Sequence, residues 1–374
     1  MRVLLLGDYS NVHATLARGL RQLGVEVVVA SDGDGWKDYP RDIDLRRPGM
    51  GKAETLKWLM QTVSKFLAFR NFDVVQIIDP VFQELRGEHL WPFYRFLRRH
   101  NRKVFMGAFG MDHYWVKAGL DCQTFRYSDF NFGNEVRGGA ENEVFIRDWL
   151  DGPKGKLNRR VVQDCDGIIA GLYEYWASYE AHCPEAKGKM TYIPFPVEVP
   201  PEKPVREPGP LQCFIGIQRS RSAYKGTDIM LRALRRIEQK YPADVIVHQV
   251  ENVPFEEYVR LMDASDIILD QLYSYTPAMN ALQAMAQGLV VVGGAEPEYY
   301  ALTARTSGSD CTLRPIVNVL PNEESVFEGL EYLVQHRDEI ARMRHDSWAF
   351  VKRYHDHVAV AKQYLEFWQG TSVS

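Results

Sequence analysis

Residues 267–292 have the sequence IILDQLYSYTPAMNALQAMAQGLVVV, and this stretch decides the fold class. It begins with branched apolar residues at 267–269 and ends with a second apolar run at 289–292. Between them, 277–286 has the alanine content and apolar spacing of a helix. Two short buried strands on either side of a helix are typical of a parallel sheet.

The same alternation extends along the chain in both directions. Strands are predicted where short, nearly continuous apolar runs occur, at 3–6, 25–30, 74–78, 104–106, 167–171, 190–193, 213–217 and 245–249. Helical spacing separates these runs, as in 52–70, 82–99, 226–239 and 254–262. Apolar strands that alternate with helices predict an α/β fold with parallel sheets covered on both faces.

A proline cluster divides the chain into two parts. Seven of the 17 residues from 194 to 210 are proline, which predicts an extended linker over 196–210. The 374 residues then form two Rossmann-like domains, 1–195 and 211–345. The first carries an aromatic and glycine-rich insertion at about 120–151. Ligands bind open α/β sheets at the carboxyl ends of their strands, so we expect the active site in a cleft between the two domains.

Composition excludes several classes of protein. The chain is 45% hydrophobic and 25% charged, which is ordinary for a globular protein, and its net charge of −4 gives no general attraction for nucleic acid. Five distant cysteines without a C-x-x-C motif favour a reducing cytoplasm. The apolar run at 3–6 is too short for the core of a signal peptide. The uncharged stretch 271–295 contains Pro277 and Gly288, so it does not predict a membrane span.

A basic loop follows the predicted strand 213–217. Arg219, Arg221 and Lys225 lie within seven residues, at the carboxyl end of that strand. Arginine can grip a diphosphate with two hydrogen bonds, and lysine adds a point charge. The alternative is a solvated run of surface charges, but the position at this edge of the sheet favours phosphate binding.

The loop before the helix 277–286 adds a second feature for anion binding. Thr276 is a good N-cap and Pro277 a good first residue, so a helix N-terminus is expected at the same edge of the sheet. Its dipole would support a pyrophosphate. Gly293 and Gly294, after the next strand, would allow the backbone to approach a ligand closely.

The first strand is followed by a loop that contains Gly7, Asp8, Ser10 and His13. The loop lacks the G-x-G-x-x-G fingerprint of dinucleotide binding. It could present free N–H groups to an anion or a polar ligand, or it could be simply a tight turn between strand and helix.

Three D-x-D triplets occur, and D-x-D can hold a divalent metal on a nucleotide diphosphate. They lie at Asp32/Asp34, Asp42/Asp44 and Asp164/Asp166. The pattern is weak in a chain with 49 acidic residues, and we interpret all three as structural. We therefore expect neither a metal nor a cofactor.

The second half resembles the C-terminal domain of GT-B glycosyltransferases, in particular the large retaining group 1 family. That family has G-R-x(4–5)-K-G after a strand, which Gly216 to Gly226 resembles with two residues inserted before the arginine. Its E-A-M-A-x-G-x-P-V-V segment is similar to 283–291. Weaker likenesses are Ile193-Pro194 before the linker and the stretch 107–112 in the first domain.

The resemblance implies roles for particular residues. Arg219 and Lys225 would hold the donor diphosphate without a metal, and the helix 276–287, with Thr276 and Asn280, would hold ribose and sugar. The tail 346–374 would form a helix that packs back on the first domain.

The chain also departs from the family's pattern. The E-x7-E glutamates of the family fall on Tyr275 and Gln283, of which only Gln283 could still bind ribose hydroxyls, and the family's first-domain histidine falls on Phe109. Asp112 and His113 then become the candidate catalytic residues. Glu296 and Glu298 are further candidates for sugar contacts.

The resemblance predicts a hexosyltransferase-type glycosyltransferase that moves a sugar from a nucleotide diphosphate donor to a glycan or lipid-linked acceptor. The acceptor would lie between His13, Asp112 and the insertion 120–151, whose aromatic faces suit sugar rings. Two alternatives stay open. One is a non-catalytic protein that binds nucleotide sugars, and the other is a different GT-B enzyme, such as a nucleotide-sugar epimerase.

Two basic and aromatic segments, 57–70 and 93–103, raise the question of membrane contact. They could lie on anionic lipid at the inner face of the membrane, with Trp58, Phe66 and Phe69 as apolar contacts. Alternatively, they are amphipathic helices that pack on the sheet with basic outer faces. The expected location is the cytoplasm in either case.

Overall fold

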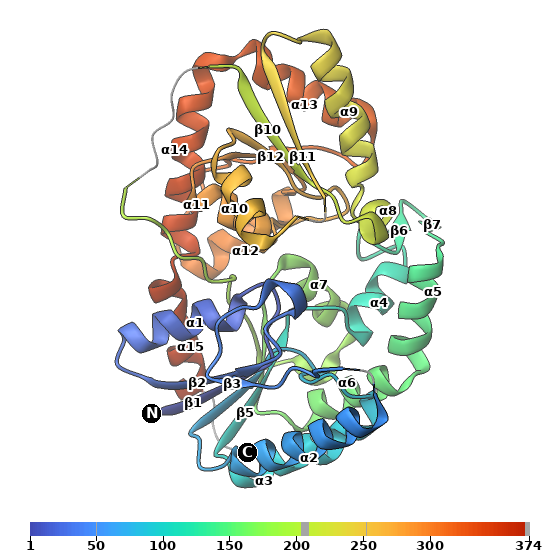
Figure 1. Ribbon diagram of the computed structural model, residues 1–374, viewed down its shortest axis with the longest axis vertical. Helices are drawn as coiled ribbons and strands as arrows, with labels where there is room; N and C mark the ends of the chain where they lie inside the picture. The colour runs from blue at the N-terminus through green and yellow to red at the C-terminus, as the bar shows by residue number, and fades with distance from the viewer. Residues whose placement is uncertain (50, 203–208, 252, 371–374) are drawn as a thin grey trace. The chain divides into compact units, whose positions relative to one another are not determined.

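The computed structural model describes residues 1–49, 51–202, 209–251 and 253–370, which form two compact units. Unit 1 comprises Met1–Arg126, Phe130–Pro196 and His357–Ser374. Unit 2 comprises Tyr127–Asp129 and Val197–Asp356. The α/β class predicted from the sequence is confirmed, since both units contain a parallel sheet with helices around it (Figure 1).

Unit 1 contains a parallel sheet of seven strands in the order β3-β2-β1-β4-β5-β8-β9. Its strands are β1 (Arg2–Leu6), β2 (Glu26–Ser31), β3 (Ile43–Asp44), β4 (Val74–Ile77), β5 (Lys103–Ala108), β8 (Gly167–Ala170) and β9 (Met190–Tyr192). The central strands β1, β4, β5 and β8 are buried along almost their whole length, because helices cover both faces of the sheet.

The longer helices of unit 1 connect these strands, except for the last one, which returns to unit 1 from the end of unit 2. They are α1 (Val12–Gln22), α2 (Lys52–Ala68), α3 (Gly87–His100), α4 (His113–Leu120), α5 (Ala140–Ile146), α6 (Pro153–Asp164), α7 (Tyr173–His182) and α15 (His357–Gly370). None of the helices in the described part of the chain is both long and apolar enough to cross a bilayer.

Unit 2 contains a parallel sheet of five strands in the order β11-β10-β12-β13-β14. The strands are β10 (Leu211–Gly216), β11 (Val245–Val250), β12 (Ile267–Leu269), β13 (Val290–Gly293) and β14 (Val317–Asn318). Its helices are α8 (Ser222–Lys225), α9 (Thr227–Lys240), α10 (Phe255–Asp263), α11 (Met279–Ala286), α12 (Pro297–Ser307), α13 (Glu323–Gln335) and α14 (Arg337–Tyr354).

The tail differs from the single helix expected over 346–374. Helix α14 ends at Tyr354 and belongs to unit 2, whereas α15 starts at His357 and belongs to unit 1. The break has a physical cause in the hydrogen bonds of His355. Its carbonyl oxygen accepts the N–H of Val197 (2.8 Å), and its Nε2 lies 3.1 Å from the Tyr299 hydroxyl oxygen.

The first part of the predicted linker 196–210 packs within unit 2. Proline has no N–H to donate, but its carbonyl oxygen still accepts. The Pro200 carbonyl accepts the indole N–H of Trp348 (3.1 Å), and the Pro201 carbonyl accepts the ammonium of Lys352 (3.1 Å). The structure therefore groups this part with a domain, although an extended linker was expected; 203–208 lie outside the described residues.

The insertion predicted at about 120–151 contains several short elements of secondary structure. It contains a two-stranded ribbon of β6 (Asn131–Phe132) and β7 (Glu135–Val136), the helix α5, and a single wide helical turn at Arg147–Asp151. Three residues within it, Tyr127–Asp129, group with unit 2. Several of its aromatic side chains are buried, which favours packing over sugar binding for Phe125, Phe130 and Trp149.

Helices α1 and α15 approach each other closely inside unit 1 at Gly19. A Cβ atom at this position would lie 2.2 Å from the carbonyl oxygen of His357 and 3.0 Å from Cβ of Ala361. At the end of α1, the side-chain amide of Gln22 lies 3.1 Å from Nε2 of His357. Glycine at position 19 is therefore required for the docking of α15.

We predict that Gly19→Ala destabilises unit 1 by about 1–3 kcal/mol, because backbone atoms of α15 must move to admit the methyl group. The matched control is Gly138→Ala, because a Cβ atom there would meet no atom within 4 Å. Urea denaturation of the full chain measures both changes. Equal stability of the two variants would contradict close packing at Gly19.

Candidate functional site

The strand order of unit 1 reverses between β1 and β4, and ligands of α/β sheets bind at such a switch point. Asp8 follows β1, and Asp79 follows β4. The carboxylate of Asp8 accepts the N–H groups of His13 (3.0 Å) and Ala14 (3.1 Å), which caps the start of α1. The N–H groups expected to face a ligand here are thus bound by the protein itself.

Burial strongly changes the ionisation of this loop. It raises the pKa of the Asp8 carboxyl to about 7 and lowers the pKa of His13 to about 3. The Nδ1 atom of His13 lies 2.7 Å from the Gly7 carbonyl oxygen, so Nδ1 carries the hydrogen. His13 is therefore neutral, and its Nε2 is an acceptor. This atom is buried and makes no hydrogen bond within the described structure.

Asp79 presents a second buried atom without a partner. Its Oδ1 accepts the N–H of Val81 (2.8 Å), while its Oδ2 makes no hydrogen bond within the described residues. Burial raises the pKa of Asp79 well above its ordinary value, and the nearby Asp112 adds to the rise. A neutral carboxyl group here can donate a hydrogen bond to an oxygen of a ligand.

The loop after β5 lies against the side chains of both His13 and Asp79. The ring of Phe109 packs edge-on against His13 with a centroid distance of 6.3 Å. A Cβ atom at Gly110 would lie 3.4 Å from Oδ2 of Asp79 and 3.1 Å from the ring of Tyr9. The unpartnered nitrogen of His13 and the unpartnered carboxyl oxygen of Asp79 thus lie around one loop, an arrangement that suits a ligand rich in hydroxyl groups.

Asp112 and His113, the predicted catalytic residues, have protein partners. Asp112 is fully buried at the start of α4, where its Oδ1 accepts the N–H of Trp115 (2.7 Å) and its Oδ2 the hydroxyl of Tyr179 (2.7 Å). Burial raises the pKa of Asp112 to about 6, against the effect of these bonds. The Nδ1 atom of His113 bonds to the Trp149 carbonyl (2.8 Å). These three hydrogen bonds stabilise the fold, and a catalytic role for either residue stays a prediction.

The strand order of unit 2 reverses between β10 and β12, and the predicted basic loop follows β10. Arg219 is 84% exposed and forms an ion pair with Glu251. Lys225 lies at the end of the one-turn helix α8, and its carbonyl accepts the N–H of Leu272 (3.0 Å). This bond ties the basic loop to the loop after β12.

Asp270, which the sequence analysis missed, directly follows β12 beside Lys225. Its side chain is buried, and burial raises its pKa, which the Lys225 ammonium opposes. Its Oδ1 accepts the amide of Asn280 (3.1 Å), and the Asn280 oxygen accepts the hydroxyl of Tyr258 (2.8 Å). Its position at a strand end could have identified Asp270 from the sequence.

The start of α11 was predicted incorrectly at Thr276 and Pro277. The helix begins at Met279 with Ala278 as its N-cap, and Thr276 is buried in the preceding loop. That loop is closed by the Ser274 hydroxyl, which bonds to the Thr276 carbonyl (3.0 Å). A Cβ atom at Gly294 would lie only 1.8 Å from the Ser274 carbonyl oxygen, so this glycine admits protein backbone where a ligand was expected.

Tyr275 and Glu296 lie together in unit 2. The N–H of Glu296 bonds to the Tyr275 carbonyl (3.0 Å), and the Glu296 carboxylate accepts the amide of Asn318 (3.2 Å). Tyr127 contacts both, since its hydroxyl donates to Glu296 and its ring lies 5.1 Å from that of Tyr275. The Glu296 carboxylate therefore lies close to Tyr275, the position at which the resembled family has its first glutamate.

Two other predicted residues lie on elements of unit 2. Gln283 is half-buried on α11, and Arg221 lies in the turn before α8. Tyr224, between Arg221 and Lys225, donates a hydrogen bond to Asp129. In unit 1, the backbone N–H of Ser10 bonds to the Asp34 carboxylate (2.9 Å).

The acidic triplets are used inside the protein. Asp34 and Asp42 accept backbone N–H groups, and Asp166 pairs with Arg98 (3.1 Å). Among the described residues, no three histidine, cysteine or acidic side chains come together as metal ligands. Independence from metal stays a prediction.

Comparisons with known proteins agree with the fold. Residues 221–366 match a family model described as glycosyl transferase-like. Sucrose-phosphate synthase from Thermosynechococcus elongatus has a similar structure, with a TM-score of 0.62 at 14% identity over 99% of both chains. Anabaena HepE, solved in complex with UDP-glucose, gives 0.57 at 13% identity over 99% of this chain and 100% of that one.

An epimerase has the same fold. UDP-GlcNAc 2-epimerase from Neisseria meningitidis, solved with UDP-GlcNAc, gives a TM-score of 0.54 at 12% identity over 99% of this chain and 100% of that chain. No curated protein sequence matches the chain. The chain has the GT-B fold, and its predicted resemblance to group 1 glycosyltransferases is confirmed.

We predict that the Asp8 carboxyl makes stability depend on pH. Aspartate ionises near pH 4 when unfolded, whereas Asp8 ionises at about 7 in the folded chain. Between these values the unfolded chain binds fewer protons, so the free energy of unfolding decreases as the pH rises. Asp8→Asn removes this contribution, and its stability relative to wild type should rise by about 2–4 kcal/mol from pH 4 to pH 8.

Urea titrations at several pH values measure this difference. Asp310→Asn, at an exposed aspartate, is the control and should follow the wild-type profile. A pH-independent difference between wild type and Asp8→Asn would contradict the raised pKa.

Proposed function

We propose that the chain is a glycosyltransferase that uses a nucleoside diphosphate sugar, binding the donor in unit 2 and the acceptor in unit 1. In the reaction, an acceptor oxygen bonds to the anomeric carbon, and the bond from that carbon to the diphosphate breaks. The nucleoside diphosphate leaves with the electron pair, and the acceptor's hydroxyl proton is released.

The observation that carries the proposal is the placement of Lys225 at the switch point of unit 2, beside buried Asp270. Lys225 also lies within the segment that matches the glycosyl transferase-like model. A lysine and an arginine can offset the charge that develops on a departing diphosphate, which is the role of a metal in other enzymes. We therefore propose that transfer is independent of metal.

The relatives support the donor class. HepE is described with UDP-glucose, and the epimerase with UDP-GlcNAc. A uridine diphosphate sugar is therefore the first donor to test. Glu296 is the carboxylate that we propose for the sugar hydroxyls, in place of the glutamate that Tyr275 replaces.

The acceptor side rests on His13 and Asp79. Their unpartnered buried atoms, a ring nitrogen that accepts and a carboxyl oxygen, match the hydroxyl groups of a glycan or of the glycosyl part of a lipid-linked acceptor. A histidine with a pKa of about 3 is a weak base at neutral pH, so we assign it to positioning the acceptor.

A second function has its own support. Tyr275 and Gln283 replace both glutamates of the resembled family, which favours a protein that binds nucleotide sugars without transferring them. Mass spectrometry with a panel of nucleotide sugars separates the two functions. Slow hydrolysis of one donor supports the transferase, epimerised sugar supports an epimerase, and binding without turnover supports the non-catalytic protein.

We predict that Arg219→Ala combined with Lys225→Ala weakens the affinity for a nucleoside diphosphate at least about 100-fold, because each lost charge-assisted bond is worth roughly 1.5–3 kcal/mol. Calorimetric titration with UDP measures the loss. Arg235→Ala, an exposed arginine on α9, is the matched control. Unchanged affinity for UDP in the double variant would show that this loop does not bind the diphosphate.

A second prediction concerns Asp79. Asp79→Ala should raise the acceptor KM about tenfold, which corresponds to the loss of one hydrogen bond to the acceptor. Hydrolysis of the donor without acceptor should stay unchanged. Asp79→Asn should restore most of the transfer, because an amide retains both the bond to Val81 and a donor at the second position. If Asp79→Ala transfers as wild type does, Asp79 does not bind the acceptor.

A further inference from the structure

Helix α2 carries large apolar side chains on two faces. Trp58, Thr62 and Phe66 are buried at a spacing of four residues. Leu56, Met60, Val63 and Leu67 repeat at helical spacing on the other side, where they are 59%, 60%, 40% and 50% exposed. Together with Leu59, they make up five of the thirteen exposed large hydrophobic residues of the described chain. We call these five residues the outer stripe of α2.

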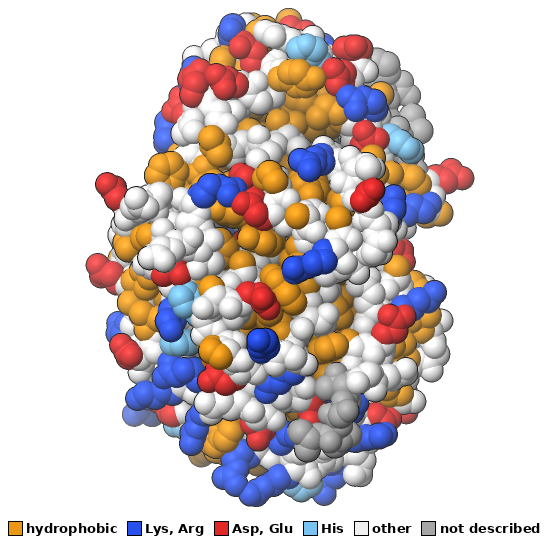
Figure 2. Space-filling model, turned by 180° about the vertical axis from the view of Figure 1, so that it is seen from behind, with side chains coloured by type: hydrophobic (Ala, Val, Ile, Leu, Met, Phe, Trp, Pro, Cys, Tyr) orange, Lys and Arg blue, Asp and Glu red, His pale blue; other side chains and the backbone are white. Residues whose placement is uncertain are grey.

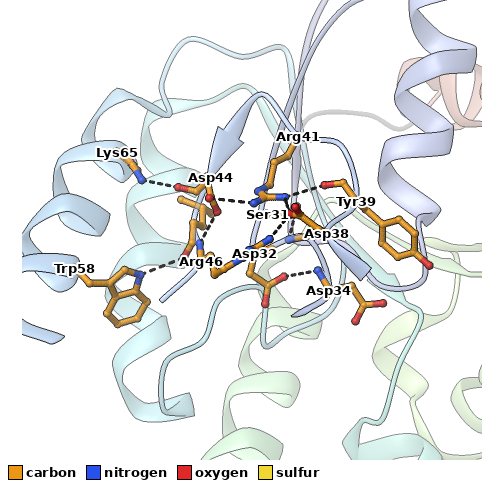
Figure 3. A network of polar contacts seen from close by, with 12 residues as sticks. Ser31, Asp32, Asp34, Asp38, Tyr39, Arg41, Asp44, Arg46, Trp58 and Lys65 are labelled. Atoms are coloured by element: carbon orange, nitrogen blue, oxygen red, sulfur yellow. Dashed lines mark hydrogen bonds and ion pairs between the residues drawn. The ribbon is translucent and has the colours of Figure 1, made fainter. Parts of the chain in front are cut away.

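The inner face fixes the orientation of the helix. The indole N–H of Trp58 donates to the Leu45 carbonyl (3.2 Å), and the Lys65 ammonium donates to the Asp44 carbonyl. Figure 3 shows both side chains pointing from α2 toward the segment after β2. That segment is held by Arg41, which bonds to both Asp38 (2.8 Å) and Asp44 (3.0 Å).

The aromatic residues on the inner face were candidates for lipid contact, and the structure shows that this interpretation is wrong. Phe66 packs against Phe69 and against Phe93 of α3, with centroid distances of 5.1 and 4.6 Å. Trp58, Phe66 and Phe69 are therefore core residues and cannot contact a lipid surface. The helix cannot turn to bury the outer stripe without losing these contacts. A helix that is apolar on both faces normally has a partner on each side.

The segments that contain α2 and α3 are rich in cations. The segments 52–70 and 87–103 hold nine lysine and arginine residues against two acidic ones, a net charge of +7 in a chain of net charge −4. Six of the nine are exposed: Lys52, Lys57, Arg70, Arg95, Arg99 and Arg102. Lysine and arginine side chains gather along the lower edge in Figure 2, at the end where Figure 1 shows α2 and α3.

We propose that the outer stripe of α2 docks unit 1 onto an anionic lipid surface. Apolar side chains would enter the boundary between head groups and acyl chains, while the cations of these segments would contact the anionic head groups. A second copy of the chain fits less well, because a symmetric dimer through this face would bring like charges together. The proposal does not depend on the reaction that the protein catalyses.

Helix α3 is an amphipathic helix that packs on the core with a basic outer face, which was the alternative to lipid contact for the segment 93–103. Leu90, Tyr94 and Leu97 are buried toward the core, and the exposed positions Arg95 and Arg99 are basic. The apolar contribution therefore comes from α2 alone, and α3 contributes charge. Removing apolar groups and removing charges should accordingly have separable effects.

Sedimentation of the full chain with vesicles tests the proposal. Vesicles of phosphatidylcholine with 30% phosphatidylglycerol should bind the protein at least tenfold more strongly than phosphatidylcholine alone, and 0.5 M salt should weaken the binding. Met60→Gln with Leu67→Gln should weaken it at least tenfold. Arg95→Glu with Arg99→Glu should abolish the preference for anionic vesicles.

The control is Ile246→Gln with Leu320→Gln, because both are exposed hydrophobic residues of unit 2. It should bind vesicles as wild type does, and circular dichroism checks that all variants fold. Wild-type protein that does not bind anionic vesicles would overturn the proposal, as would equal binding by Met60→Gln/Leu67→Gln. Self-association that this double variant abolishes, without vesicle binding, would assign the stripe to a second copy.

Discussion

Lys225 and the buried carboxyl of Asp270 lie at the point where the strand order of the five-stranded sheet reverses, and the charge of Lys225 opposes the rise in the pKa of Asp270. Taking a carboxyl group out of water is costly unless a cation or hydrogen bonds compensate, and here Lys225 and Asn280 both do. The backbone N–H of Leu272 bonds to the Lys225 carbonyl (3.0 Å) and ties the basic loop to the loop after β12. The proposed donor site depends on this arrangement.

Much of the fold could be predicted from the sequence, because apolar strands that alternate with helices leave few arrangements other than parallel sheets. The basic loop was predicted for the same reason, since it directly follows the strand β10. Asp270 directly follows β12 and Asp79 lies two residues after the end of β4, so their positions could be predicted from the sequence, but their burial could not. Their unusual ionisation results from packing that only the three-dimensional structure shows.

Contacts between residues distant in sequence explain the other differences. Tyr127 was attributed to an aromatic insertion of the first domain, whereas its hydroxyl bonds to Glu296, 169 residues away. The tail was expected to be one helix, but bonds to Val197 and Tyr299 interrupt it at His355. The composition of α2 indicated an apolar and basic helix. The periodicity of its sequence did not show which of its two apolar faces would pack against the core.

A crystal structure with a uridine diphosphate sugar bound is the most direct test of the proposed donor site. If Lys225 and Arg219 hold the donor, diphosphate oxygens should lie within hydrogen-bond distance of both side chains, and Arg219 should exchange Glu251 for the diphosphate. The sugar should then lie near Glu296. A donor bound away from the carboxyl ends of β10 and β12 would contradict the assignment.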